Sequence, residues 1–225
     1  MRKIAVITSI FGNGTKLFDP ATVFENTDYF AFVDKEHDCK VWKQIKSPSF
    51  SMDQKYQGRR DAKIYKIMPH LFLPEYDVYI WTDPTHELIK NPHDVCDEYL
   101  KEHDIALFYH TTRKCAYKEA AEIIKLNYDH IDLVENQVKY YSDSGFPERH
   151  GLFELPVSIR KNCESINAMN LRWWEQICKF SSRDQISLPF VLWSMNIRPN
   201  ILPGLANGGL HKNEILPQVR WKWQQ

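Results

Sequence analysis

Long apolar runs and an excess of charge are both missing from this sequence. No stretch approaches the ~20 apolar residues that a helix needs to span a bilayer. The 29 basic residues balance the 29 acidic ones, which argues against a general attraction to nucleic acid or to an anionic membrane. The apolar run at 4–7 is too short for a signal peptide. We therefore expect a cytoplasmic protein with no transmembrane segment and no nucleic-acid partner, or a soluble domain of something longer.

Several fingerprints of known chemistry are also absent. The sequence contains no Gly-x-Gly-x-x-Gly, no Walker loop and no Gly-x-Ser-x-Gly, which removes the usual signatures of dinucleotide-binding, kinase-type and hydrolase proteins. Its five cysteines are scattered, without a Cys-x-x-Cys or a Cys/His spacing that would suit a metal. They are expected to be reduced thiols.

What is plentiful is material for a core. Hydrophobic residues make up 43% of the 225 residues and aromatic residues 13%, which suits one domain over 1–225. Strand-like and helix-like segments alternate, and this alternation predicts an α/β fold with a mostly parallel central sheet flanked by helices. Strands are expected at 3–9, 28–34, 41–45, around Trp81 up to Pro84, at 105–109 and at 155–160, and helices at 58–70, 91–101, 118–127, 131–141, 167–180 and 183–194.

The run at 76–85 is the most informative segment. Its apolar strand ends on Asp83, and Pro84 stops the strand because proline has no N–H to give. Open α/β sheets bind ligands at the carboxyl ends of their strands. Sugar-nucleotide transferases place an Asp-x-Asp at this point to hold a divalent cation, and here Thr85 replaces the second acid. Asp83 and Thr85 are thus candidate metal ligands, and an ordinary Asp-Pro turn is the alternative.

Two other expected strands also end in polar residues. Thr8, Ser9, Phe11 and Gly12 lie at the exit of the first strand, where hydroxyl and backbone N–H groups can meet a nucleotide. Asp34 follows the second strand and can accept hydrogen bonds from a base or a ribose. The alternatives are a plain strand exit and a turn or helix cap.

A basic helix precedes the strand that ends on Asp83. Arg60 and Lys63 are three residues apart, so they share a face and can neutralise a diphosphate. Arg59 and Lys66 are assigned to the same basic face, opposite Ala62. The alternative is that this face is simply solvated.

A second polar block occupies 181–187. Asp184 and Gln185 can point from a helix N-terminus toward a sugar, whereas the competing interpretation is that the serines before them cap the helix. Near the end, His211 on a glycine-rich loop is a further candidate metal ligand, and Lys212 a candidate phosphate contact.

Three residues are candidates for binding an acceptor. His110 and Arg113 follow another strand, and Trp174 offers an aromatic face to a sugar ring. Because Trp173 is adjacent and must point in another direction on a helix, at least one of the two tryptophans is expected in the core.

Taken in order, these segments resemble the mucilage-related, glycosyltransferase-like domain family of plants and bacteria. The resemblance covers roughly 3–194, and its most specific parts are the Trp-x-Asp block at 81–83 and the Ser-Arg-Asp-Gln block at 182–185. It implies the GT-A fold, a nucleoside-diphosphate sugar as donor, Mn²⁺ or Mg²⁺ as cofactor and a place in polysaccharide biosynthesis. Residues 1–90 would then bind the donor and 91–225 the acceptor.

A weaker similarity is to glycogenin-type retaining transferases. By position, Asp83 matches their metal aspartate, Asp184 and Gln185 their sugar-contacting pair, and His211 their late metal ligand. We therefore expect a transferase that moves a hexose or related sugar to a glycan or glycolipid acceptor, with retention favoured over inversion. A catalytically silent sugar- or nucleotide-binding module and a sugar-phosphate nucleotidyltransferase stay open as alternatives.

Overall fold

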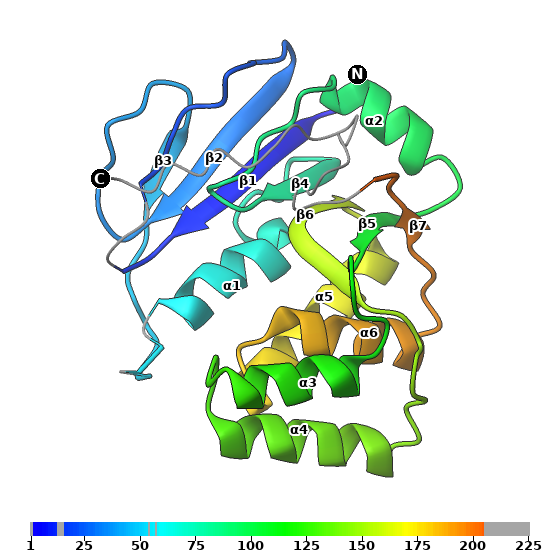
Figure 1. Cartoon of the computed structure of the whole chain (residues 1–225). Helices are drawn as coiled ribbons and strands as arrows, with labels where there is room; N and C mark the ends of the chain where they lie inside the picture. Colours follow the sequence, from blue (N-terminus) through cyan, green and yellow to red (C-terminus); the bar gives the residue numbers. More distant parts are fainter. Residues whose placement is uncertain (1, 13–15, 54, 57, 205–225) are drawn as a thin grey trace.

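The computed structural model describes residues 2–12, 16–53, 55–56 and 58–204. The described part forms a seven-stranded sheet with the order β3-β2-β1-β4-β6-β5-β7 (Figure 1). The strands are β1 (Ile4–Ile10), β2 (Thr27–Val33), β3 (Lys43–Lys46), β4 (Val78–Thr82), β5 (Ile105–Tyr109), β6 (Phe153–Lys161) and β7 (Asn200–Ile201). Only β6 of these runs antiparallel to its neighbours, β4 and β5. The predicted α/β fold with a mostly parallel sheet is confirmed.

The strand order of the sheet reverses between β1 and β4. From β1 the chain proceeds through β2 to β3 on one side and then returns to β4 on the other side of β1. Both β1 and β4 are buried along their whole length, because each is covered on both faces, and their sequences are accordingly near-continuous apolar runs. Such a reversal of strand order is where open α/β sheets bind ligands.

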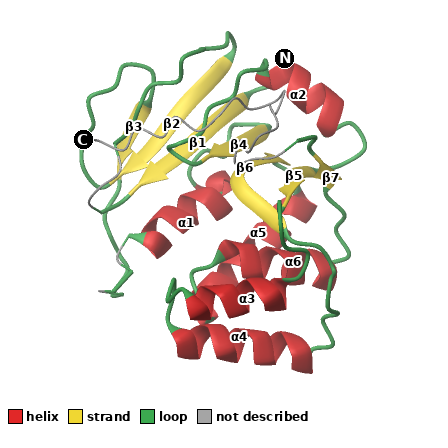
Figure 2. Ribbon diagram, viewed as in Figure 1, coloured by secondary structure: helices red, strands yellow, loops and turns green. Residues whose placement is uncertain are grey.

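The helices cover the two faces unequally (Figure 2). Helix α2 (Pro92–Tyr99) packs on one face, against residues of β1 and β4. Helices α1 (Arg59–Ile67), α5 (Glu164–Lys179) and α6 (Asp184–Ser194) cover the other face. Helices α3 (Ala116–Lys125) and α4 (Ile131–Asp143) form an outer layer, in which α3 packs on both α6 and α4. None of the helices in the described part combines the length and apolar character needed to cross a bilayer.

Helix boundaries show where sequence patterns were reliable. Asn91 caps α2 as expected, accepting a hydrogen bond from the backbone N–H of His93 at 2.9 Å, with Pro92 in the first turn. The predicted helix at 58–70 ends earlier, at Ile67, and a short 3₁₀ turn, η1 (Pro69–Leu71), follows it. Pro69 disfavours a helical conformation at the residue before it, which ends α1.

The serine capping considered for α6 is wrong. The helix begins at Asp184, and its N-cap residue, Arg183, makes no side-chain capping bond. The Ser181 hydroxyl instead donates to Gln137 Oε1 at 2.5 Å, and the Ser182 hydroxyl donates to Asp129 Oδ2 at 2.6 Å. Both serines are buried and fasten the start of α6 to α4 and to the turn that precedes it.

Candidate active site

Asp83 lies at the carboxyl end of β4, at the point where the strand order reverses. Its backbone N–H donates to the carbonyl of Pro156 at 2.7 Å, and its Oδ1 accepts from Trp81 Nε1 at 2.7 Å. The side chain is 40% exposed. Asp83 is therefore fixed by two neighbouring strands and still open to a ligand.

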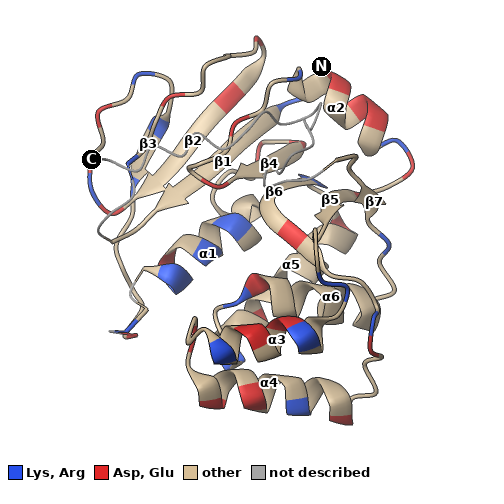
Figure 3. Ribbon diagram, in the orientation of Figure 1, with Lys and Arg blue, Asp and Glu red and all other residues tan. Residues whose placement is uncertain are grey.

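Two lysines of α1 converge on Asp184. The Nζ atoms of Lys63 and Lys66 lie 2.6 and 2.7 Å from Asp184 Oδ2. Lys66 is 2% exposed, donates to the carbonyl of Leu155 at 2.6 Å and stands 3.7 Å from Asp83 Oδ1. Basic residues recur along α1 in Figure 3. The two candidate aspartates are thus joined through the ammonium group of Lys66, and for this residue the alternative of a solvated helical face is wrong.

The electrostatics of this cluster fix the charge of Asp184. Burial by itself raises the pKa of Asp184, but the ammonium groups of Lys63 and Lys66 outweigh burial and hold the pKa well below its usual range. Burial lowers the pKa of Lys63 to about 8, although the Asp184 charge opposes that shift. A carboxylate held ionised in this way is a poor proton acceptor and a good electrostatic partner for positive charge.

A bulge in β6 connects several members of the site. The register with β5 passes from Leu107↔Ser158 to Phe108↔Glu154, which leaves 155–157 as extra residues. The bulge carbonyls at 155 and 156 accept the hydrogen bonds from Lys66 and Asp83. Just before the bulge, the carbonyl of Phe153 accepts from Gln185 Nε2 at 3.4 Å. Such bulges are over-represented beside active sites because they redirect groups that a regular strand would align.

A second group forms at the exit of β1. The Gly12 N–H donates to Asp34 Oδ2 at 2.7 Å, and Asp34 Oδ1 is buried without a hydrogen-bond partner among the described residues. The Ser9 hydroxyl donates to the carbonyl of Ala62, and the Phe11 ring stacks on Tyr65, so both fasten β1 to α1.

Thr8 is the remaining candidate at this exit. It is fully buried, and its hydroxyl has no partner within the described residues. Thr8 precedes Ser9 in a strand and therefore faces the opposite side of the sheet, away from α1.

Arg60 points away from Lys63. Its guanidinium donates to the backbone carbonyls of Ile177 and Phe180, the latter at 2.8 Å, at the C-terminal end of α5. Cationic side chains commonly satisfy the last carbonyls of a helix in this way. Lys66, three residues after Lys63, occupies the position toward the site, and the helical spacing that paired Arg60 with Lys63 also pairs these two lysines.

The acceptor candidates fall into two places. Arg113 Nε donates to the buried Glu119, and His110 Nδ1 accepts from the Arg113 backbone N–H at 3.1 Å. Burial lowers the pKa of His110, although the charge of Glu119 opposes that shift. Trp174 contacts Phe50 at a ring-centroid distance of 6.2 Å, whereas Trp173 is fully buried, as the adjacency of the two predicted.

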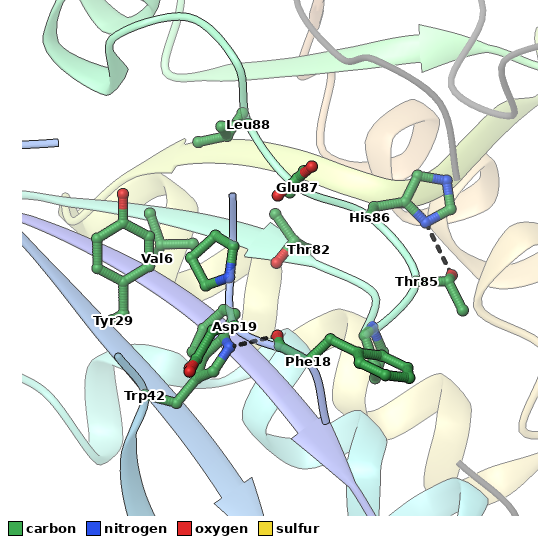
Figure 4. A pocket seen from close by; sticks show the side chains of 12 residues that line it. Val6, Phe18, Asp19, Tyr29, Trp42, Thr82, Thr85, His86, Glu87 and Leu88 are labelled. Atoms are coloured by element: carbon green, nitrogen blue, oxygen red, sulfur yellow. Dashed lines mark hydrogen bonds between the residues drawn. The ribbon is translucent and has the colours of Figure 1, made fainter. Parts of the chain in front are cut away.

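A pocket opens beside the turn that follows Asp83 (Figure 4). Tyr29, Trp42 and Leu88 contribute apolar walls, and Thr82 contributes a buried hydroxyl. Figure 4 shows the Thr85 hydroxyl turned toward His86, with Oγ1 3.0 Å from Nδ1.

These contacts limit what can hold a metal. Among the described residues, no group of three or more acidic, histidine or cysteine side chains could hold an ion. Asp83 offers one carboxylate, and the Thr85 hydroxyl already has the His86 ring nitrogen as a partner. The candidates His211 and Lys212 lie outside the described residues. Mg²⁺-type sites with one or two carboxylates are completed by water and substrate phosphates. The described residues therefore fit a cation that arrives with a diphosphate, not one held by protein groups alone.

Fold and site together define a class, an α/β protein with lysine and aspartate side chains at the switch point of a mostly parallel sheet. The model of the TOD1/MUCI70 glycosyltransferase-like domain family matches residues 1–205, and the chain belongs to this family. It is also 27% identical over 146 residues to the probable hexosyltransferase MUCI70 of Arabidopsis thaliana, covering 60% of the chain and 25% of that protein. The chain thus spans about a quarter of the length of this curated relative.

Solved structures with a similar arrangement include three glycosyltransferases. The bifunctional glycosyltransferase WbbM aligns with a TM-score of 0.45 and 12% identity over 86% of this chain and 38% of its own. Core-mannan synthase A of Aspergillus fumigatus, in an Mn/GDP form, aligns with a TM-score of 0.43 and 9% identity over 85% of this chain and 70% of its own. The mannosyltransferase Ktr4p of S. cerevisiae aligns with a TM-score of 0.39 and 10% identity over 84% of this chain and 66% of its own. TM-scores this low carry no functional argument.

Proposed function

We propose that this chain transfers a hexose or related sugar from a nucleoside-diphosphate sugar to a glycan or glycolipid acceptor. The observation that carries the proposal is that Lys63 and Lys66 both contact Asp184 and that Lys66 also reaches Asp83 at the switch point, in a chain that belongs to a glycosyltransferase-like family. Fold class alone would not distinguish this activity from others. In this proposal 1–90 supplies most donor contacts and 91–225 most acceptor contacts.

In this proposal the donor lies across the carboxyl ends of β1 and β4. The partly exposed Lys63 ammonium meets the diphosphate, and Gly12 and Asp34, whose Oδ1 has no described partner, meet the nucleoside. A divalent cation, when bound to the diphosphate, would neutralise the leaving group with Asp83 as its protein ligand.

Asp184 then acts through its charge. Because two lysines keep it ionised, it stabilises the positive charge that develops on the sugar and does not collect the acceptor proton. This role favours attack on the same face of the sugar as the leaving group, hence retention. Gln185 orients the sugar from the next position of α6, and His110, Arg113 and Trp174 face the acceptor.

A panel of nucleotide sugars, measured by thermal shift and by hydrolysis with and without Mn²⁺, tests this proposal. Binding and release of nucleoside diphosphate support a transferase. Binding without any turnover identifies a silent sugar- or nucleotide-binding module, and turnover of a nucleoside triphosphate with a sugar phosphate identifies a nucleotidyltransferase.

Lys63 provides the residue-level check. Lys63→Ala should weaken nucleoside diphosphate binding by ~1.5–3 kcal/mol, the range for hydrogen bonds to charged groups, as measured by calorimetry. Lys43, which pairs with Asp28 at the opposite end of the sheet, is the matched control, and Lys43→Ala should leave the affinity unchanged. Equal affinities for both variants would remove Lys63 from the donor site.

A further inference from the structure

Glu154 carries a buried oxygen whose hydrogen-bonding capacity is unused. The residue is 2% exposed at the start of β6, and its Oε1 accepts from the backbone N–H and the hydroxyl of Thr111 at 3.1 and 2.8 Å. Its Oε2 is equally buried and has no hydrogen-bond partner among the described residues. Arg113, in the adjoining loop, pairs with Glu119. An unpaired buried carboxylate oxygen is costly, so it calls for an explanation.

The position of Glu154 connects it with the site. Because β6 runs antiparallel to β4 and β5, its first residues lie at the sheet edge where those two strands end (Figure 1). The carbonyl of the residue before it, Phe153, accepts a hydrogen bond from the Gln185 side chain. The carbonyls of the next two residues, 155 and 156, accept from the Lys66 ammonium and the Asp83 backbone N–H. Glu154 thus belongs to the short segment on which three groups of the candidate site are fastened.

The chemistry of Glu154 indicates what it would bind. An ionised carboxylate only accepts hydrogen bonds, so its partner must be a donor. The first turn of α3, directly after this loop, contains a second buried carboxylate, Glu119, with which Arg113 is already paired, and two buried carboxylates in one place make an anionic ligand unfavourable. Thr111, whose backbone N–H and hydroxyl both contact Glu154 Oε1, is itself exposed, so the carboxylate lies one hydrogen-bonded residue away from the protein surface. A hydroxyl-rich ligand arriving at the turn can supply the missing donor.

We propose that Glu154, together with the loop at 110–113, binds a sugar hydroxyl and so helps to set sugar specificity. This inference rests on the proposed function for its setting, since the hydroxyl belongs either to the donor sugar or to the acceptor. In both cases Glu154 is a binding residue that fixes the orientation of the sugar.

Glu154→Gln is the decisive variant. Glutamine keeps the shape and the carbonyl that Thr111 contacts, but it places an NH₂ donor where the carboxylate offers an acceptor. Glu148→Gln, in the exposed turn before β6, is the matched control. The probes are UDP, GDP, UDP-glucose, UDP-galactose, UDP-galacturonic acid and GDP-mannose, followed by a glycan array, and circular dichroism confirms that both variants are folded.

The outcomes separate the two sources of the hydroxyl. If it belongs to the donor, Glu154→Gln binds the nucleotide sugar roughly 10- to 100-fold more weakly and binds the free nucleoside diphosphate normally. If it belongs to the acceptor, donor affinity and hydrolysis stay at the wild-type level while glycan binding is lost. Wild-type behaviour of Glu154→Gln with every probe overturns the inference.

Failure of the proposed function would look different. If the wild type binds glycans but none of the nucleotide probes, the proposed transferase activity is overturned. The comparison of glycan binding by Glu154→Gln and Glu148→Gln then still tests whether Glu154 binds a sugar hydroxyl. A wild-type chain that binds none of the probes overturns both proposals.

Discussion

At the scale of single residues, Asp184 has the most demanding surroundings. Its side chain is 7% exposed and compensates two ammonium groups, of which that of Lys66 is almost completely buried. A buried charge that loses its partner is strongly destabilising, whereas replacing a whole buried pair by apolar groups is often neutral. The Asp184 carboxylate therefore contributes to the stability of the fold and is also the proposed partner of the reacting sugar.

Asp184→Asn should lower the free energy of unfolding by ~3–5 kcal/mol, because it removes the carboxylate charge that both lysines contact and leaves Lys66 with the more distant Asp83 alone. Folding lowers the pKa of Asp184, so its contribution is present above the unfolded value of about 3.9 and is lost as pH falls through the native value. Urea titrations should accordingly show the gap between variant and wild type narrowing below about pH 4.

Lys66→Met in the Asp184→Asn background serves as the control. It removes the buried ammonium that the first substitution stranded, so the double variant should regain part of the lost stability. Unfolding of Asp184→Asn at the wild-type urea concentration would contradict the ion-pair account.

At the scale of elements, the start of α1 is set against the exit of β1. Gly58 precedes the helix with φ +83°, a conformation that L side chains rarely adopt, and a Cβ there would lie 2.9 Å from the backbone oxygen of Phe11. This close approach positions both the lysines of α1 and the Gly12–Asp34 contact. A helix boundary thus controls two parts of the candidate donor site.

Gly58→Ala should be more destabilising than Gly145→Ala, in chemical denaturation. Gly145 has a similar φ of +78°, but a Cβ there would meet nothing within 4 Å. Both variants incur the left-handed cost of roughly 1–2 kcal/mol. Gly58→Ala adds overpacking against β1, roughly another 1–3 kcal/mol. Equal losses in the two variants would show that the contact with Phe11 does not constrain α1.

At the scale of the whole molecule, the site is assembled from segments far apart in the sequence. Asp83 follows β4, the two lysines come from α1, and Asp184 begins α6. The carbonyls that hold Lys66 and Asp83 in place belong to the bulge in β6. The assembled groups include one partly exposed carboxylate for a cation, so metal binding should depend on the donor.

Mn²⁺ alone should raise the melting temperature little, whereas Mn²⁺ together with a nucleoside diphosphate should raise it more than either ligand alone. The reason is that the phosphates supply oxygen ligands that the described residues lack. Asp83→Asn should remove the cooperative part of the shift and keep the response to nucleotide alone. A large shift with Mn²⁺ alone would point to a cation site held by the protein itself.

The sequence by itself determined most of the helices and strands, with boundaries shifted by a few residues, but not β7, which lies in a segment predicted to be a loop. Buried parallel strands have nearly continuous apolar sequences, so β1, β4 and β5 were predictable. The start of α2 was predictable because Asn91 and Pro92 act through local backbone geometry. The acidic end of β4 was equally visible, because a proline directly after an apolar strand ends it wherever the strand lies in the sheet.

Only the tertiary structure decided which charged groups meet. Arg60, Lys63 and Lys66 follow one another at the same spacing of three residues. Arg60 nevertheless donates hydrogen bonds to the end of α5, whereas the two lysines form ion pairs with Asp184. Glu154 reads as a lone acid inside an apolar strand until the reversed β6 and its bulge bring it to the edge where β4 and β5 end. Local patterns follow from backbone sterics and burial, whereas the partner of a charge depends on contacts between segments about 120 residues apart, which no local pattern records.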